Sequence, residues 1–500
     1  MQVESNTSAS LLEPLNVTGA NESTQQRLSG QMGARALALT VLAFSAPIAV
    51  VTGYIPFTIT FDGAGACFAF IVTTVLMILF SIGYVTMAKH VPKPGDFYSF
   101  ISSGLGKIVG LGAAFLAIAS YIFILGGTYA FLGISVQAFI LSLHGPSTEW
   151  WAWAILGWAI VSTLGYFHIE LSAKILSLAM VGEVLIVMIF NVAVLVKGGS
   201  EGLPIAPLTP AAFFHGDVPV TLLFAILVFL GFEATALFRD EVRDPDRTIP
   251  KATYAAVLFI GVLYALSAYT MVAAYGQKAV DVATNTPSMM FPHAIGVFVA
   301  PIFTQIAYGF VIASVVAALI SIHNVLSRYV LNLALDKAIP IYLGRVHSRH
   351  RSPHRASTAV AVCVAVGMMP FIMGNVDANT LYGRMCGLGS LGVIVLMTLV
   401  SLAVIVWFIR AGVPAGVSIF RIYIAPAIAM LSLGATVVFA LLHFDLVVGG
   451  APGENNALAF VLLATLIAGS LLAVYFKLMR PHVYDSLGRA DRLFDLAVDD

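Results

Sequence analysis

Long apolar runs separated by short polar segments recur from residue 35 to residue 478 of the chain. A helix that crosses the hydrocarbon core of a bilayer needs about 20 apolar residues, because it rises about 1.5 Å per residue across about 30 Å. Only helices and closed barrels satisfy the backbone in lipid, and the runs lack the alternation of barrel strands. The pattern therefore predicts an all-α integral membrane protein with twelve transmembrane helices, at 35–58, 65–88, 105–131, 151–168, 174–196, 219–238, 251–275, 297–325, 356–373, 385–409, 420–442 and 457–478.

Composition supports the membrane assignment and excludes several classes of protein. Of the 500 residues 59% are hydrophobic and 10% are charged, whereas about 25% of a soluble domain is charged. The 25 Lys and Arg equal the 25 Asp and Glu, so no basic surplus indicates nucleic acid. Three distant cysteines and scattered histidines form no metal motif, and the sequence has no P-loop. We expect no metal, no cofactor, no ATP-driven pump and no nucleic-acid partner.

The basic residues indicate the sidedness of the chain. If both termini are cytoplasmic, 22 of the 25 Lys and Arg fall on the cytoplasmic side, and only Lys197, Lys278 and Arg384 fall outside. Cytoplasmic segments of membrane proteins carry an excess of Lys and Arg. The sequence therefore predicts a multi-pass protein of the cell membrane with both tails, 1–34 and 481–500, in the cytoplasm.

Two of the predicted spans contain residues that interrupt helices. In span one, Pro47 lacks an N–H and frees carbonyls in the preceding turn, so the helix should open at Ser45–Pro47 or, alternatively, at Thr52–Gly53. In span six, Gly231 tolerates a break and Glu233 places a carboxyl in an apolar helix. A proline kink and a packing glycine explain each span equally well alone. Together they occupy the first helix of two successive sets of five, as an inverted repeat requires.

A charged segment follows span six. From Arg239 to Lys251, four basic and four acidic residues occupy thirteen positions. Thr248 can cap span seven and Pro250 can open it. The segment is interpreted as a compact cytoplasmic hinge, and a solvated charged loop is the alternative.

At this point the sequence resembles the amino acid, polyamine and organocation transporter superfamily, in its amino acid permease branch. Gly231-Phe232-Glu233 followed by the segment 244–250 is similar to the signature of that family. Pro92 to Tyr98 resembles its entry to span three, and Arg328 to Pro340 its exit from span eight. The resemblance implies a leucine-transporter-like fold with a first inverted repeat over 35–196, a second over 219–409, and two peripheral helices within 420–480.

The resemblance also implies where a substrate binds. In such permeases the substrate carboxylate meets freed N–H groups of helix one, and its ammonium meets freed carbonyls of helix six. Span one departs from the Gly-x-Gly pattern of the family. Carried onto this chain, the candidates are Phe44, Ser45, Ala46 and Ile48 in span one and Leu227, Val228, Phe229, Leu230 and Gly231 in span six.

Two buried glutamates are candidates for coupling. Glu183 lies in span five, where an isolated charge is costly, so it must be neutral or paired. By alignment with the family it replaces a lysine of proton-coupled relatives, and it would exchange a proton or hold a cation. Glu233 would bind freed N–H groups or titrate during transport. A structural hydrogen bond is the alternative for both, and Ser314 in span eight is interpreted as a packing residue.

These features together predict a secondary active transporter and not an enzyme. The expected substrate is an amino acid or related small amine, moved by alternating access, with a proton or sodium as the coupling ion and symport as the expected mechanism. An exchanger of polyamines or organic amines and a nutrient sensor that binds without translocating remain alternatives. The expected assembly is a monomer or a homodimer within membrane lipid.

Overall fold

The computed structural model describes residues 33–91, 97–167, 173–236, 242–347, 352–448, 456–488 and 498–499. The predicted N-terminal tail, 1–34, lies outside them except for its last two residues. The helices of the first half are α1 (Ala34–Phe44), α2 (Pro47–Gly53), α3 (Ile55–Asp62), η1 (Gly63–Gly65), α4 (Ala66–His90), α5 (Phe97–Leu105), α6 (Lys107–Ser142), α7 (Trp150–Tyr166), α8 (Ala173–Lys197), η2 (Ala206–Leu208), α9 (Pro210–Phe213), α10 (Val218–Leu227) and η3 (Phe232–Ala236).

The second half continues with helices and one pair of very short strands. Its elements are α11 (Pro245–Tyr275), η4 (Gly276–Lys278), α12 (Ala279–Asn285), α13 (Pro287–Phe298), α14 (Ile302–Leu335), η5 (Ile341–Gly344), β1 (Val346–His347), α15 (His354–Met373), α16 (Ala378–Ala411), η6 (Phe420–Ile424), α17 (Ala425–Leu442), α18 (Phe444–Val448), α19 (Asn456–Met479), α20 (Pro481–Ser486) and β2 (Val498–Asp499). The two strands pair in parallel. The all-helical prediction is confirmed apart from this pair.

Nine helical stretches in the described part of the chain are long and apolar enough to cross a membrane. The difference from the twelve predicted spans has three sources. One stretch, Pro47–His90, joins parts of spans one and two. Span four is α7, which has only 17 residues, and span six is interrupted after the 10 residues of α10. A multi-pass helical protein is therefore established, and the twelve-span arrangement remains a prediction.

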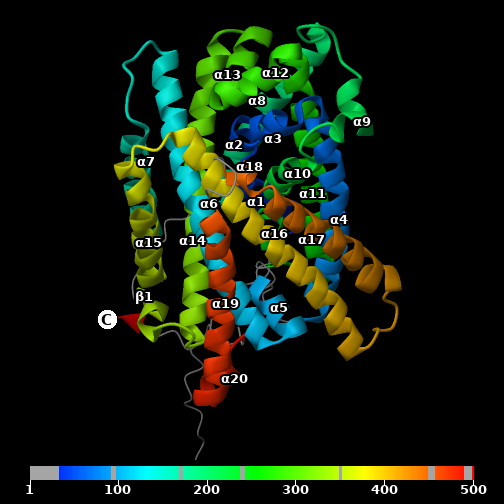
Figure 1. Ribbon diagram of the computed structural model, residues 1–500, viewed down its shortest axis with the longest axis vertical. Helices are drawn as coiled ribbons and strands as arrows, with labels where there is room; N and C mark the ends of the chain where they lie inside the picture. Colours follow the sequence, from blue (N-terminus) through cyan, green and yellow to red (C-terminus); the bar gives the residue numbers. More distant parts are fainter. Residues whose placement is uncertain are drawn as a thin grey trace, which may run out of the picture.

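The interrupted helices lie inside the bundle. Figure 1 shows α1, α2, α3 and α10 near its centre, with α5 and α20 at one end and α9, α12 and α13 at the other. Long helices surround them: α6 contacts α14, α16 and α19, and α4 contacts α11 and α17. Only 17% of the apolar stretch of α19 is buried, compared with 61% for α6. The fold thus places two broken helices where other helices can complete a site.

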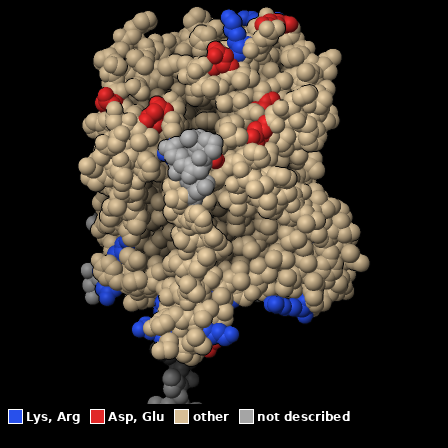
Figure 2. All heavy atoms as spheres, viewed as in Figure 1, with Lys and Arg blue, Asp and Glu red and all other residues tan. Residues whose placement is uncertain are grey.

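On the face shown in Figure 2, charged side chains lie mostly towards the two ends of the molecule. In the face shown in Figure 2, most Lys and Arg lie at the end that carries α5 and α20, and most Asp and Glu lie towards the opposite end. The band between them is almost entirely uncharged on this face. This distribution matches what a bilayer requires of the surface it surrounds.

Candidate functional site

The first predicted span is interrupted at Ser45 and Ala46. Helix α1 ends at Phe44 and α2 begins at Pro47. Between them Ala46 adopts a left-handed conformation, with φ of 45°, which is unfavourable for a residue with a Cβ. At Thr52–Gly53 the backbone bonding is nearly helical, because the N–H of Tyr54 donates to the carbonyl of Val50 at 2.9 Å. The structure places the main break at the first of the two predicted positions.

The sixth predicted span is interrupted just before Gly231. Helix α10 ends at Leu227, a turn covers 228–231, and η3 begins at Phe232. Gly231 has a φ of 107°, a conformation that glycine adopts without strain. Its N–H donates to Glu233 Oε2 at 2.8 Å. The glutamate therefore compensates one amide that the break releases.

A cavity lies between the two breaks. It contains about 970 Å³ of empty space, part of which is open to solvent. Its wall draws on helices from both predicted repeats and is mainly apolar. The lining residues are Ser45, Ala46, Ala49, Val50, Tyr54, Phe97, Tyr121, Ile124, Thr128, Phe131, Leu227, Val228, Leu230, Gly231, Glu233, Val315, Ala318, Ile322, Val325, Tyr329 and Tyr382.

Several polar groups at the cavity wall have hydrogen-bond partners within the protein. Tyr121 donates from its hydroxyl to Glu233 Oε1 at 3.1 Å. Since Glu233 Oε2 accepts from Gly231, both carboxylate oxygens have protein partners. Ser45 Oγ and the hydroxyl of Tyr264 are 2.7 Å apart. Few polar side chains are left to recognise a charged substrate side chain.

Glu183 lies outside the cavity wall but contacts the break in span one. Its Oε2 accepts from the N–H of Ile48 at 3.3 Å and from the hydroxyl of Ser314 at 2.8 Å. The residue is 5% exposed. One carboxylate thus connects α8, the start of α2 and α14. A carboxylate at the first turn of a helix is favourably placed with respect to the helix dipole.

An aromatic cluster, defined as Tyr54, Phe57, Phe131, Phe224 and Tyr382, borders one side of the cavity. The rings of Phe131 and Tyr382 are stacked with centroids 4.7 Å apart. The ring centroid of Phe57 lies 5.4 Å from that of Tyr382 and 5.2 Å from that of Phe224. Aromatic pairs of this kind each add about 0.5–1.5 kcal/mol to the stability that follows from buried area. The cluster brings together side chains from α3, α6, α10 and α16 and the residue between α2 and α3.

The sequence-based candidates fall into two groups. Those that line the cavity are Ser45, Ala46, Leu227, Val228, Leu230, Gly231 and Glu233. Ile48 and Phe229 are fully buried and do not line it, and the side chain of Phe44, the last residue of α1, lies outside the described set. Thr128, Phe131, Tyr329 and Tyr382 also line the cavity, but they lie on helices without a local break and carry no signal in the sequence.

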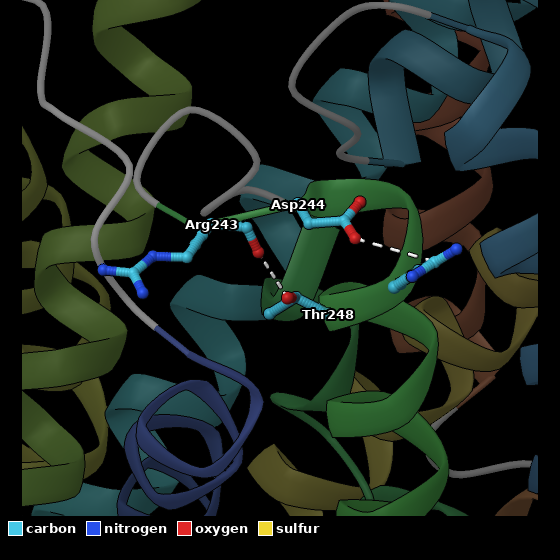
Figure 3. Close-up of polar contacts among 4 residues, drawn as sticks. Arg243, Asp244 and Thr248 are labelled. Atoms are coloured by element: carbon cyan, nitrogen blue, oxygen red, sulfur yellow. Dashed lines mark hydrogen bonds and ion pairs between the residues drawn. The ribbon is translucent and has the colours of Figure 1, made fainter.

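The start of α11 differs from the prediction. The helix begins at Pro245, not at Pro250, which lies inside it. Thr248 is not the cap, because it lies within the first turn and donates from its hydroxyl to the carbonyl of Arg243 (Figure 3). Pro245 already supplies the fixed φ of a first helical position. Residues 239–241 of the predicted hinge lie outside the described residues.

Comparison with known families identifies the chain. The amino acid permease family model matches residues 38–479. The chain belongs to the amino acid permease family. The match covers most of the permease sequence, including both breaks and Glu183. It confirms the resemblance to the amino acid, polyamine and organocation superfamily.

Individual relatives of the permease differ in their named substrates. The branched-chain amino acid permease BcaP of Bacillus subtilis is 23% identical, over 77% of this chain and 83% of its own length. The chloroplastic cationic amino acid transporter 7 of Arabidopsis thaliana is 25% identical, over 61% of this chain and 54% of its own length. The lysine-specific permease of Saccharomyces cerevisiae is 23% identical, over 68% of this chain and 57% of its own length. The relatives support amino acid transport as a class but point to different side chains.

Proposed function

We propose that this permease is a secondary active transporter that moves an uncharged, apolar amino acid by alternating access. The observation that carries the proposal is the cavity enclosed by the breaks in spans one and six. Half-helix ends inside a membrane present partial charges of opposite sign. Such a pair fits the two charged groups shared by all free α-amino acids.

The substrate backbone is proposed to bind at these ends. Its carboxylate faces the first turn of α2, where Ala46 and Ala49 line the cavity. Its ammonium faces the carbonyls at the end of α10, where Leu227 and Val228 line the cavity. Ile48 and Phe229, which are fully buried, then shape the breaks without touching the ligand.

The preference for an apolar side chain follows from the cavity wall. Ile124, Val315, Ala318 and Ile322 offer only hydrocarbon to the ligand. The one carboxylate at the wall, Glu233, already accepts two hydrogen bonds from the protein. A cationic side chain would have to displace these bonds, which disfavours lysine and polyamines.

Coupling to an ion is assigned to Glu183. The carboxylate contacts the start of α2 and Ser314, so a change in its charge acts directly on the break that binds substrate. We propose that it takes up a proton with the substrate and releases it on the other side. A sodium ion beside the carboxylate is the alternative for the same position.

The wider architecture is part of the proposal. The twelve spans would form two inverted repeats, 35–196 and 219–409, each with its first helix broken, and α17 and α19 would be peripheral. The concentration of Lys and Arg at the end with α5 and α20 supports placing that end, and both termini, in the cytoplasm of a cell-membrane protein.

Uptake into proteoliposomes tests the proposal. The purified protein should accumulate radiolabelled leucine faster than lysine or spermidine, and an imposed inward proton gradient should increase accumulation. A sodium gradient alone should not. Binding of leucine without accumulation under any gradient would make the protein a sensor. Uptake that depends on amine preloaded inside the vesicles would make it an exchanger, and either result would overturn the proposal.

A further inference from the structure

The C-terminal segment contacts two inner elements of the bundle at one point. Helix α5 supplies Tyr98, and the residue after α14 is Asp336. The hydroxyl of Tyr98 donates to Asp336 Oδ2 at 2.8 Å. The N–H of Gly488 donates to the same Oδ2 at 2.9 Å and to Tyr98 Oη at 2.8 Å. Three segments far apart in the sequence therefore share one hydrogen-bonded cluster.

The position of Asp336 makes this cluster energetically significant. The residue is 7% exposed, and it caps the C-terminal end of α14, where the helix dipole disfavours a negative charge. A buried carboxylate needs hydrogen-bond donors to offset its desolvation. The C-terminal segment provides one of these donors, so its attachment stabilises the local charge.

Further contacts fix the same segment along the end of the bundle. Lys107, at the start of α6, donates from Nζ to the carbonyls of Tyr484 and Asp485 at 3.1 and 2.9 Å. The hydroxyl of Ser486 donates to the carbonyl of Asp336 at 3.0 Å. Figure 1 shows α20 at the same end of the molecule as α5.

The last described residues of the chain pair with a second segment, β1. Strand β2 pairs in parallel with β1, which lies between α14 and α15. In sequence, residues 345–355 around β1 contain four Arg and three His, whereas residues 495–500 contain three Asp. Within the pair, His347 lies opposite Asp499.

The cluster lies directly behind the cavity wall. Phe97, the neighbour of Tyr98, lines the cavity from α5. Tyr329, two turns before Asp336 on α14, lines it as well. The residues that the C-terminal segment joins are therefore continuous with two residues that border the proposed substrate site.

We propose that the C-terminal segment, 481–488 with β2, is an intrachain clamp that holds α5 and the end of α14 together and so restrains opening of the cavity towards that end. The inference rests on the proposed transport function only for its consequence, a slower release of substrate. Detachment of the clamp shifts the protein towards a state whose cavity is accessible from the end with α5.

Cysteine labelling tests the clamp without requiring transport. Val325 lines the cavity and Cys363 is exposed, so Val325→Cys in a Cys363→Ser background reports access to the cavity. Into it we would introduce Tyr98→Phe, Ser486→Ala or a stop after Arg480. The matched control is Tyr342→Phe, since Tyr342 is exposed and its ring, beneath Arg355, is retained in phenylalanine.

The clamp predicts that each of the three changes raises the rate of maleimide labelling at residue 325 by about fivefold or more, the lower range of coupling between sites. The Tyr342→Phe control should label at the original rate. Lower thermal stability with unchanged labelling in the folded variants would show a purely structural role and overturn the clamp. If labelling rises while the parent protein accumulates no amino acid, the clamp stands and the proposed transport function fails.

Discussion

At the scale of single residues, Glu183 and Gly53 show how strongly this protein depends on close contacts across helices. The Glu183 carboxylate accepts from Ile48 on α2 and Ser314 on α14. A Cβ added at Gly53 would lie 2.4 Å from the hydroxyl of Tyr382 and 3.0 Å from Phe131. Each end of α2 is therefore in close contact with side chains from other helices.

Replacing Glu183 with glutamine should remove the pH dependence of uptake. Wild-type uptake should rise as the external pH is lowered, because protonation of Glu183 from outside accompanies substrate entry. The side-chain amide of glutamine preserves size but does not exchange a proton in this range, so the profile should become flat. Initial rates of leucine uptake against external pH measure this. The control is Glu149→Gln, at an exposed glutamate, and a wild-type profile in Glu183→Gln would exclude proton coupling through this residue.

Replacing Gly53 with alanine should disturb the aromatic cluster and slow transport. The new methyl group would force Tyr382 to move, and overpacking of this kind costs about 1–3 kcal/mol. If the cost destabilises a state through which transport must pass, uptake should drop by about tenfold, since about 1.4 kcal/mol corresponds to a factor of ten. Gly309→Ala is the control, because nothing lies within 4 Å of the Cβ it would add. Equal uptake by both variants would show that transport does not depend on the packing of the cluster.

At the scale of secondary-structure elements, α19 is attached to α6 through reciprocal glycines. A Cβ at Gly112 would lie 2.6 Å from the carbonyl oxygen of Leu466, and one at Gly469 would lie 2.6 Å from the carbonyl oxygen of Leu111. Small residues allow membrane helices to approach each other closely. Helix α19 is only weakly buried, and it is held against α6 by close contact between the two backbones.

Replacing Gly112 with alanine should separate α6 from α19 and lower the stability of the protein. The obstacle is backbone, which cannot rotate away, so a loss of about 1–3 kcal/mol is expected. Thermal unfolding in detergent should show a lower Tm. Gly367→Ala should not lower it, because its added Cβ has no neighbour within 4 Å. An unchanged Tm for Gly112→Ala would mean that α19 is not tightly held.

At the scale of the whole molecule, the distribution of charge defines the proposed orientation. Most Lys and Arg on the face in Figure 2 lie at the end with α5 and α20. Ser200 follows α8 and Tyr342 belongs to η5, and the proposed topology places them on opposite sides of the membrane. Both are exposed, so both are suitable positions for a reporter of sidedness.

Single cysteines at these two positions should respond differently to an impermeant maleimide on intact cells. In a Cys363→Ser background, Ser200→Cys should be labelled from outside, whereas Tyr342→Cys should be labelled only after permeabilisation. The parent without an added cysteine gives the background signal. The opposite pattern would mean that the end with α5 and α20, and the C-terminal clamp with it, faces the outside of the cell.

The helical membrane fold could be predicted from the sequence alone, because the lengths of apolar runs are set by the bilayer and not by distant contacts. The break in span six could be located in the same way, since Gly231 acts through local backbone chemistry, whereas Pro47 and Gly53 left two positions open in span one. The predicted start of α11 was wrong. Pro245 and Pro250 are both suited to the first position of a helix, and the local sequence does not show which of them opens α11.

The set of side chains that encloses the cavity, in contrast, depends on tertiary packing. Thr128, Phe131, Tyr329 and Tyr382 carry no local signal, and they come together because three intact helices pack around the two broken ones. The same holds for the contact of Glu183 with the segments that carry its two hydrogen-bond donors. Contacts between residues more than a hundred positions apart depend on how the helices are arranged in space, and no local pattern in the sequence specifies that arrangement.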